Sequence, residues 1–81
     1  MRMTAVDITL DVLGFHCPVP VHETKSRLAK MASGQVLLVM ADDPETRADL
    51  PALLNRTGDD LLGMVEEAGE YHYTIRKGAK A

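Results

Sequence analysis

The stretch Gly14-Phe15-His16-Cys17-Pro18-Val19-Pro20 joins the first two segments of regular structure and contains the only cysteine of the chain. Proline fits the first turn of a helix, where its missing N–H is not needed, and it disfavours a helical conformation in the residue before it. We therefore expect Cys17 and Val19 to be extended, Val19 to be an N-cap and Pro20 to begin a helix. Gly14 supplies a flexible or positive-φ position on the approach.

This placement makes Cys17 a candidate reactive thiol. The open end of the following helix carries unpaired N–H groups and about half a positive charge. Such an end can lower a cysteine pKa from about 8.5 to roughly 3.5–7.5, and the thiolate is the nucleophilic form. A lone cysteine is otherwise often an inert buried side chain, so its placement alone leaves both interpretations open.

The segments on either side of this stretch predict a βαβ unit. Apolar and polar residues alternate from Val6 to Val12, which is typical of a strand with one exposed face. An apolar stripe with a helical period runs from Pro20 to Ala32. The continuous apolar run within 35–41 suits a central strand covered on both faces. Strand, helix and strand in this order predict a parallel, right-handed unit.

The second half of the chain predicts a helix and a hairpin. Asp42-Asp43-Pro44 resembles a helix start, with an aspartate cap before a proline, and Gly58 is a helix stop. Pro51 lies inside this segment, so we expect either a kink there or a short turn before a helix that starts near Asp49. Residues 61–67, with a bulge at Gly63, and residues 71–76 form the hairpin strands.

The predicted fold class is α+β, a two-layer α/β sandwich with the order βαβαββ. Two helices most easily cover one face of a four-stranded mixed sheet and so enclose one core. The length of 81 residues allows a single domain over residues 1–81, with a frayed polar tail over 77–81.

Composition excludes several classes of protein. Apolar residues make up 46 % and charged residues 26 % of the chain, which is within the range of globular proteins. The formal net charge of −3 argues against a surface devoted to nucleic acid. A single cysteine fits a reducing compartment, and no targeting or membrane-spanning stretch is visible. We expect a cytoplasmic protein that binds neither membranes nor, directly, nucleic acid.

Two further kinds of site are weak candidates. His16, Cys17 and His22 are potential zinc ligands, but the first two are adjacent in an extended segment and should diverge. We therefore expect no metal and no other cofactor. His16 and His22 are possible modulators of the thiol, although no third residue completes a catalytic triad. Asp42 and Asp43 are paired carboxylates, and helix capping is the favoured interpretation of them.

These residues, taken together, resemble the TusA/SirA family of small sulfur-carrier proteins. The Cys-Pro-x-Pro motif is Cys17-Pro18-Val19-Pro20, and Gly14 matches the glycine that precedes it. The resemblance continues through Ser33-Gly34-Gln35, Ala41-Asp42-Asp43-Pro44, Asp49-Leu50-Pro51, Thr57-Gly58 and the strand that ends at Lys77. It covers nearly the whole chain, and it is the combination of motifs that makes it specific.

The resemblance implies a function and a site. It implies that Cys17 accepts sulfane sulfur as a persulfide and that Pro18 and Pro20 are the motif prolines. It also implies two protein partners: a sulfur donor of the cysteine desulfurase or rhodanese-like kind, and an acceptor. The pathway is left open among tRNA thiolation, molybdenum-cofactor supply and sulfur oxidation.

The motif departs from its family at two positions. The variable position is often acidic but is Val19 here, and this absence of a carboxylate should ease thiolate formation and change which partner docks. His16 before the cysteine is less usual.

The alternative functions are a regulatory or interaction module without catalysis on the same fold, and a small nucleic-acid binder.

Overall fold

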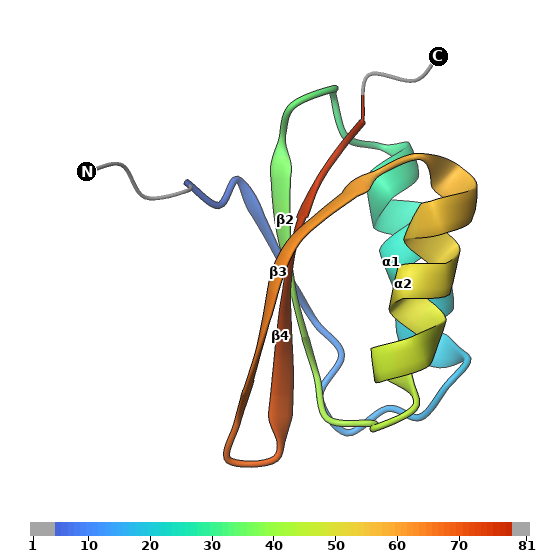
Figure 1. The fold of residues 1–81 in the computed structure, drawn as a ribbon, viewed down its shortest axis with the longest axis vertical. Coiled ribbons are helices and arrows are strands. Elements are labelled where there is room, and N and C mark those ends of the chain that lie inside the picture. Colours follow the sequence, from blue (N-terminus) through green and yellow to red (C-terminus); the bar gives the residue numbers. More distant parts are fainter. Residues whose placement is uncertain (1–4, 79–81) are drawn as a thin grey trace.

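Two helices lie on one face of a four-stranded sheet, as the edge-on view of the sheet in Figure 1 shows. The structure is a computed structural model, and it describes residues 5–78. The strand order is β1-β2-β4-β3, with β1 parallel to β2 and the other neighbours antiparallel. This arrangement confirms the predicted two-layer α+β fold and the order βαβαββ. The elements are β1 (Ile8–Asp11), α1 (Val19–Ala29), β2 (Val36–Ala41), α2 (Thr46–Thr57), β3 (Asp60–Glu67) and β4 (Glu70–Arg76).

Strand β2 occupies the centre of the sheet between β1 and β4. Its residues Leu37, Val39 and Ala41 are completely buried, whereas the alternate residues Leu38 and Met40 are only half-buried. The expectation that this strand is covered on both faces is therefore wrong. The reason is that both helices pack on the same side of the sheet, so that within residues 5–78 no second layer covers the other side.

Helix α1 begins one residue earlier than its sequence indicates. Val19 is its first residue and Pro18 its N-cap, and the Val19 N–H donates a hydrogen bond to the carbonyl of His16 at 3.0 Å. Val19 is thus helical and not extended, because the preference of a residue before proline is weak enough for a local turn to override it. Pro20, Thr24 and Leu28 form the buried side of the helix.

Helix α2 runs without a break from Thr46 to Thr57 and contains Pro51. One of the two expectations for this segment, a helix that starts near Asp49, is therefore wrong. Burial of Leu50, Leu53 and Leu54 against the sheet outweighs the loss of one backbone hydrogen bond at the proline. The helix ends as expected at Gly58, which has a φ of 83° and donates its N–H to the Leu54 carbonyl at 2.9 Å.

The hairpin of β3 and β4 contains the expected irregularity, a register shift between Leu61 and Gly63. Strand β3 is at the edge of the sheet, and all eight of its residues are exposed. Beyond β4, the Lys77 N–H donates to Gln35 and the Gly78 N–H donates to Asp59, both at 2.8 Å. These two residues are therefore held in place, which differs from the expected frayed tail; residues 79–81 of that tail lie outside the described residues.

The core fills the space between the helices and the sheet. It contains Leu10, Val12, Leu28, Met31, Leu37, Val39, Ala41, Leu50, Leu53, Leu54, Tyr71, Tyr73 and Ile75. Within residues 5–78, no helix has the length and apolar character that a membrane crossing requires.

Candidate functional site

Cys17 lies at the edge of the sheet where the two parallel strands β1 and β2 end. The segment that carries it follows β1, and residues 42–45 follow β2. Because parallel strands have their carboxyl ends at the same edge, the two connections meet there, as the lower part of Figure 1 shows. Cys17 immediately precedes Pro18, the N-cap of α1, and Cys17 is partly exposed. The cysteine is therefore held in a partly exposed position, in a loop between a strand and a helix.

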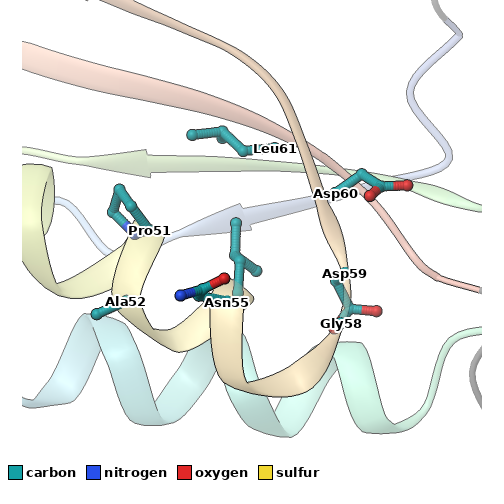
Figure 2. Close-up of a pocket in the computed structure, with 8 residues that line it drawn as sticks. Pro51, Ala52, Asn55, Gly58, Asp59, Asp60 and Leu61 are labelled. Atoms are coloured by element: carbon teal, nitrogen blue, oxygen red, sulfur yellow. The ribbon is translucent and has the colours of Figure 1, made fainter.

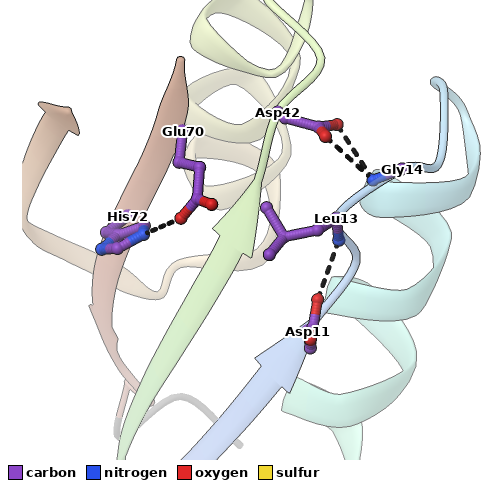
Figure 3. Close-up of polar contacts among 6 residues, drawn as sticks. All are labelled: Asp11, Leu13, Gly14, Asp42, Glu70 and His72. Atoms are coloured by element: carbon purple, nitrogen blue, oxygen red, sulfur yellow. Dashed lines mark hydrogen bonds and ion pairs between the residues drawn. The ribbon is translucent and has the colours of Figure 1, made fainter. Parts of the chain in front are cut away.

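Two neighbouring aspartates fix the Cys17 loop to the end of β2. Both carboxylate oxygens of Asp42 accept a hydrogen bond from the Gly14 N–H, at 3.1 and 3.0 Å (Figure 3). Asp43 Oδ2 accepts a hydrogen bond from the Cys17 N–H at 2.7 Å. Gly14 has a φ of 85°, as expected for a position that favours glycine. Two side chains of the connection after β2 thus fix the backbone conformation of the connection after β1.

Asp43 also shapes the start of α2, although it is not the helix N-cap. Its Oδ1 accepts a hydrogen bond from the Glu45 N–H at 3.0 Å, and its carbonyl accepts one from Thr46 Oγ1 at 2.7 Å. The N-cap is Glu45, which has no side-chain capping bond. The capping interpretation of the aspartate pair therefore holds only for the turn before the helix. The sequence did not indicate that the second oxygen of Asp43 would bind the Cys17 loop.

A buried hydrogen bond between Thr46 and Tyr73 supports the turn at Asp43. The hydroxyl groups of Thr46 and Tyr73 lie 2.7 Å apart, and both residues are almost completely buried. Burial raises the pKa of the Tyr73 phenol. The turn that holds the Cys17 loop is in this way tied to the central part of the sheet.

The thiol is surrounded by negative charge. Burial, a hydrogen bond to Asp49 and the charges of Asp43, Asp49 and Glu45 raise the pKa of Cys17 from an ordinary value of 9.0 to about 12. The prediction of a lowered thiol pKa is therefore wrong. Burial disfavours the thiolate first, and the partial positive charge of a helix end is smaller than the charges of these three carboxylates, which the fold brings from another part of the chain.

We name Asp43, Glu45 and Asp49 the acidic collar. The Cys17 Sγ and one carboxylate oxygen each of Asp43 and Glu45 all lie within 4.8 Å of one another. Among the residues described, this is a group that could hold a metal ion, but acidic groups often gather in this way without one, and we assign none. Although the variable position is Val19, carboxylates distant in the sequence lie near the sulfur.

The other predicted site residues have different surroundings. Pro20 is completely buried, and Pro18 is exposed at the N-cap. His16 is exposed and lies near Asp43, because its charge contributes to the lowered pKa of that carboxyl. His22 is also exposed, and it lines a shallow hollow of about 280 Å³ on α1 together with Lys25 and Ser26. Neither histidine forms part of the collar.

A larger hollow, of about 670 Å³, lies away from the thiol between α2 and the start of β3 (Figure 2). Pro51, Asn55 and Leu61 are among the residues that line it, and Cys17 is not. The site that combines a nucleophile with charged neighbours is therefore the surface around Cys17 and not the larger of these two hollows.

Sequence reasoning missed the acidic collar. Asp43 and Asp49 belong to the quoted family motifs, but the sequence indicates only a capping role for Asp43 and no role for Asp49 or Glu45. The parallel βαβ order contained a usable signal, because it requires residues after β1 and after β2 to meet.

Comparison with known proteins shows the family to which the chain belongs. Residues 8–77 match the family model described as "Sulfurtransferase TusA". The chain is 48 % identical over 73 residues to the sulfur carrier protein TusA of Pseudomonas entomophila, covering 90 % of this chain and 91 % of that one. It is 41 % identical over 75 residues to the TusA of Allochromatium vinosum, covering 93 % and 99 %.

A solved structure has the same fold. The crystal structure of a SirA-like protein from Desulfitobacterium hafniense superposes with a TM-score of 0.79 at 31 % sequence identity, covering 89 % of this chain and 99 % of that one. The two helices and the four-stranded mixed sheet thus form a known architecture. The chain belongs to the TusA family of sulfur carrier proteins.

Proposed function

We propose that Cys17 carries sulfane sulfur as a persulfide between two partner proteins. The observation that carries the proposal is the position of the only cysteine, at the surface and at the carboxyl ends of β1 and β2, in a chain of the sulfur carrier family. The hydrogen bond from its N–H to Asp43 fixes the backbone beside the sulfur. A fixed and accessible sulfur is what transfer between two proteins requires.

Loading is a thiol exchange in which no external oxidant takes part. The Cys17 thiol loses its proton, and its sulfur attacks the outer sulfur of a persulfide on the donor. A bond forms between Sγ and that sulfur, the S–S bond of the donor breaks, and the donor thiolate leaves and takes up the proton. Attack by an acceptor thiol on the new outer sulfur repeats the exchange and returns Cys17 to the thiol form. One cysteine is sufficient, since each partner supplies the other sulfur.

The donor that best fits this chemistry is a cysteine desulfurase or a rhodanese-like protein that carries its own persulfide, in a reducing compartment such as the cytoplasm. The acceptor serves tRNA thiolation, molybdenum-cofactor supply or sulfur oxidation. No metal or organic cofactor takes part in the exchange. The alternative is an interaction module on the same fold, in which Cys17 carries nothing.

The test is the intact mass of the reduced protein after it is mixed with polysulfide or with a persulfide-loaded desulfurase or rhodanese. We expect a gain of one sulfur atom that a reductant reverses. The control is Cys17→Ser with an unchanged circular dichroism spectrum, which should gain none. A wild-type protein that takes no sulfur from any of these donors, or a Cys17→Ser variant that is loaded equally, would contradict the proposal and favour the interaction module.

A further inference from the structure

We propose that the acidic collar keeps Cys17 as an unreactive thiol in the free protein, and that a partner activates it by placing a cationic side chain between the collar carboxylates. The kind of partner is therefore one whose sulfur site is rimmed by arginine or lysine. The inference deepens the proposed function, since it rests on transfer of sulfur through Cys17. It adds the condition under which that transfer takes place.

The geometry of the collar is the first argument. Asp43 lies beneath the Cys17 loop and binds its N–H at 2.7 Å, so that this carboxylate cannot move away from the sulfur without breaking that bond. Glu45 and Asp49 are one helical turn apart, and the Asp49 N–H donates to the Glu45 carbonyl at 3.0 Å. Residues four apart share one face of a helix. Two carboxylates therefore face the thiol from the start of α2, beside a third that is fixed.

Coulomb repulsion supplies the second argument. Oxygens of Asp43 and Glu45 lie within 4.8 Å of the Cys17 sulfur, and Asp49 is among the groups that raise the pKa of the thiol. A thiolate would be a fourth negative charge within this group. Like charges at such distances favour the protonated form, and a cation placed among them favours the ionised form.

The remaining titratable groups near the site do not offset the collar. His16 is the nearest histidine in the same loop, and its positive form interacts with Asp43. Tyr73, on β4, is buried, and the charge of Cys17 acts on its phenol. The Arg47 guanidinium lies over the Tyr71 ring, 5.6 Å from its centroid, and its charge acts on Tyr73. A cation that compensates the negative charge around Cys17 would therefore have to come from a partner.

The partner's cation has room to enter, because Glu45 is exposed and Asp49 is half-exposed. An ammonium or guanidinium group placed there would pair with the carboxylates and, at the same time, lie close to the sulfur. The same contact would align the partner's own sulfur with Cys17. Activation and docking would then occur together. Small reagents that lack a cation would react slowly with the thiol.

The experiment measures how fast neutral iodoacetamide alkylates the reduced full-length protein between pH 6 and 12, followed by intact mass. We expect the wild-type rate to keep rising above pH 9. In Glu45→Gln and Asp49→Asn the rate at pH 8 should increase, roughly tenfold for each unit by which the thiol pKa falls. Glu45→Lys places a cation in the collar and should give the largest increase.

The matched control is Asp60→Asn, which removes an exposed carboxylate at the opposite end of the sheet and should react like the wild type. A second arm adds a hexa-arginine peptide, which should accelerate the wild type and have little effect on a variant with both Glu45→Gln and Asp49→Asn. A hexa-glutamate peptide should accelerate neither protein. Circular dichroism of each variant at every pH confirms that folded protein is compared.

The outcomes separate this inference from the proposed function. Coincident pH profiles for the wild type and the collar variants would overturn the inference, even if Cys17 takes up sulfur normally. Equal acceleration of both proteins by hexa-arginine would overturn it too. Shifted profiles together with no sulfur uptake from any donor would support the collar as a control of thiol reactivity and would reject the sulfur-carrier proposal.

Discussion

The carboxylate of Asp43 accepts a hydrogen bond from the backbone N–H of Cys17 at 2.7 Å, across 26 positions of the sequence. This bond joins the connection after β2 to the connection after β1. The second oxygen of the same carboxylate binds the Glu45 N–H, so that one side chain organises both the cysteine loop and the turn before α2. The position of the sulfur is therefore a property of the tertiary structure.

Replacing Asp43 by alanine should lower the stability of the protein. Two backbone N–H groups, those of Cys17 and Glu45, would lose a charged acceptor in a part of the site that is largely shielded from water. Urea unfolding followed by circular dichroism measures the effect as a lower midpoint. The control is Asp42→Ala, which removes an exposed carboxylate and its bond to Gly14. Equal midpoints for the two variants would contradict the role given to Asp43.

Acid should destabilise the wild type partly through Asp43. The hydrogen bond from the Cys17 N–H, followed by that from Glu45, holds the pKa of this carboxyl below its ordinary value of 3.8. A lowered pKa in the folded state gives stability that is present above about pH 4 and is lost as the pH falls through the folded pKa. Urea midpoints from pH 6 to 2 should fall less steeply in Asp43→Asn. Parallel curves for the two proteins would show that Asp43 is not the group responsible.

Alkali should destabilise the reduced protein through Cys17. Its pKa is raised to about 12 in the folded state, chiefly by burial and then by Asp49, from an ordinary value of 9.0. The unfolded chain therefore ionises first, and stability that is complete below pH 9 is lost as the pH rises towards 12. Because serine does not ionise in this range, Cys17→Ser should lose less stability between pH 8 and pH 11. Urea midpoints measure this, and a variant that loses as much as the wild type would contradict it.

Substitution of Gly14 by alanine should cost about 1 kcal/mol, because an L-residue is strained in the left-handed region. Gly14 has a φ of 85°, while a Cβ there would meet no atom within 4 Å, so that backbone strain is isolated from steric overlap. Gly63→Ala is a matched control: it also has open space around the added Cβ, and its φ is not in that region. Thermal unfolding of both variants gives the comparison. A loss of stability in Gly63→Ala as large as that in Gly14→Ala would argue against strain as the cause.

Truncation of Leu50 to alanine should destabilise the protein by about 2–5 kcal/mol, the usual range for a buried leucine. Leu50 is 0 % exposed and lies on the side of α2 that faces the sheet, one position before Pro51. Leu62→Ala, at a position that is 41 % exposed on β3, should change stability by less than about 1 kcal/mol. Urea unfolding of the two variants distinguishes them. A small effect at Leu50 would mean that packing does not keep α2 continuous through the proline.

The sequence predicted the elements well where local signals agree. Alternation around Leu10, the apolar run around Val39 and the stop at Gly58 all correspond to observed features. The ends of elements were less predictable. Val19 became helical through a bond to the His16 carbonyl, and α2 started at Thr46 because burial of its leucines maintains a helix that the proline alone would disfavour.

Periodicity, prolines and motif spacing are local properties, and they were enough to predict the βαβαββ order, the loop that carries the cysteine and the resemblance to the sulfur carrier family. The electrostatic environment of Cys17, in contrast, depends on how the chain folds. Asp43, Glu45 and Asp49 lie 26 or more positions away from it, and the parallel pairing of β1 with β2 brings their charges to the sulfur. Burial and Coulomb interactions both depend on the arrangement in space, and so a helix end that favours the thiolate is outweighed by burial and by carboxylates that the local sequence does not contain.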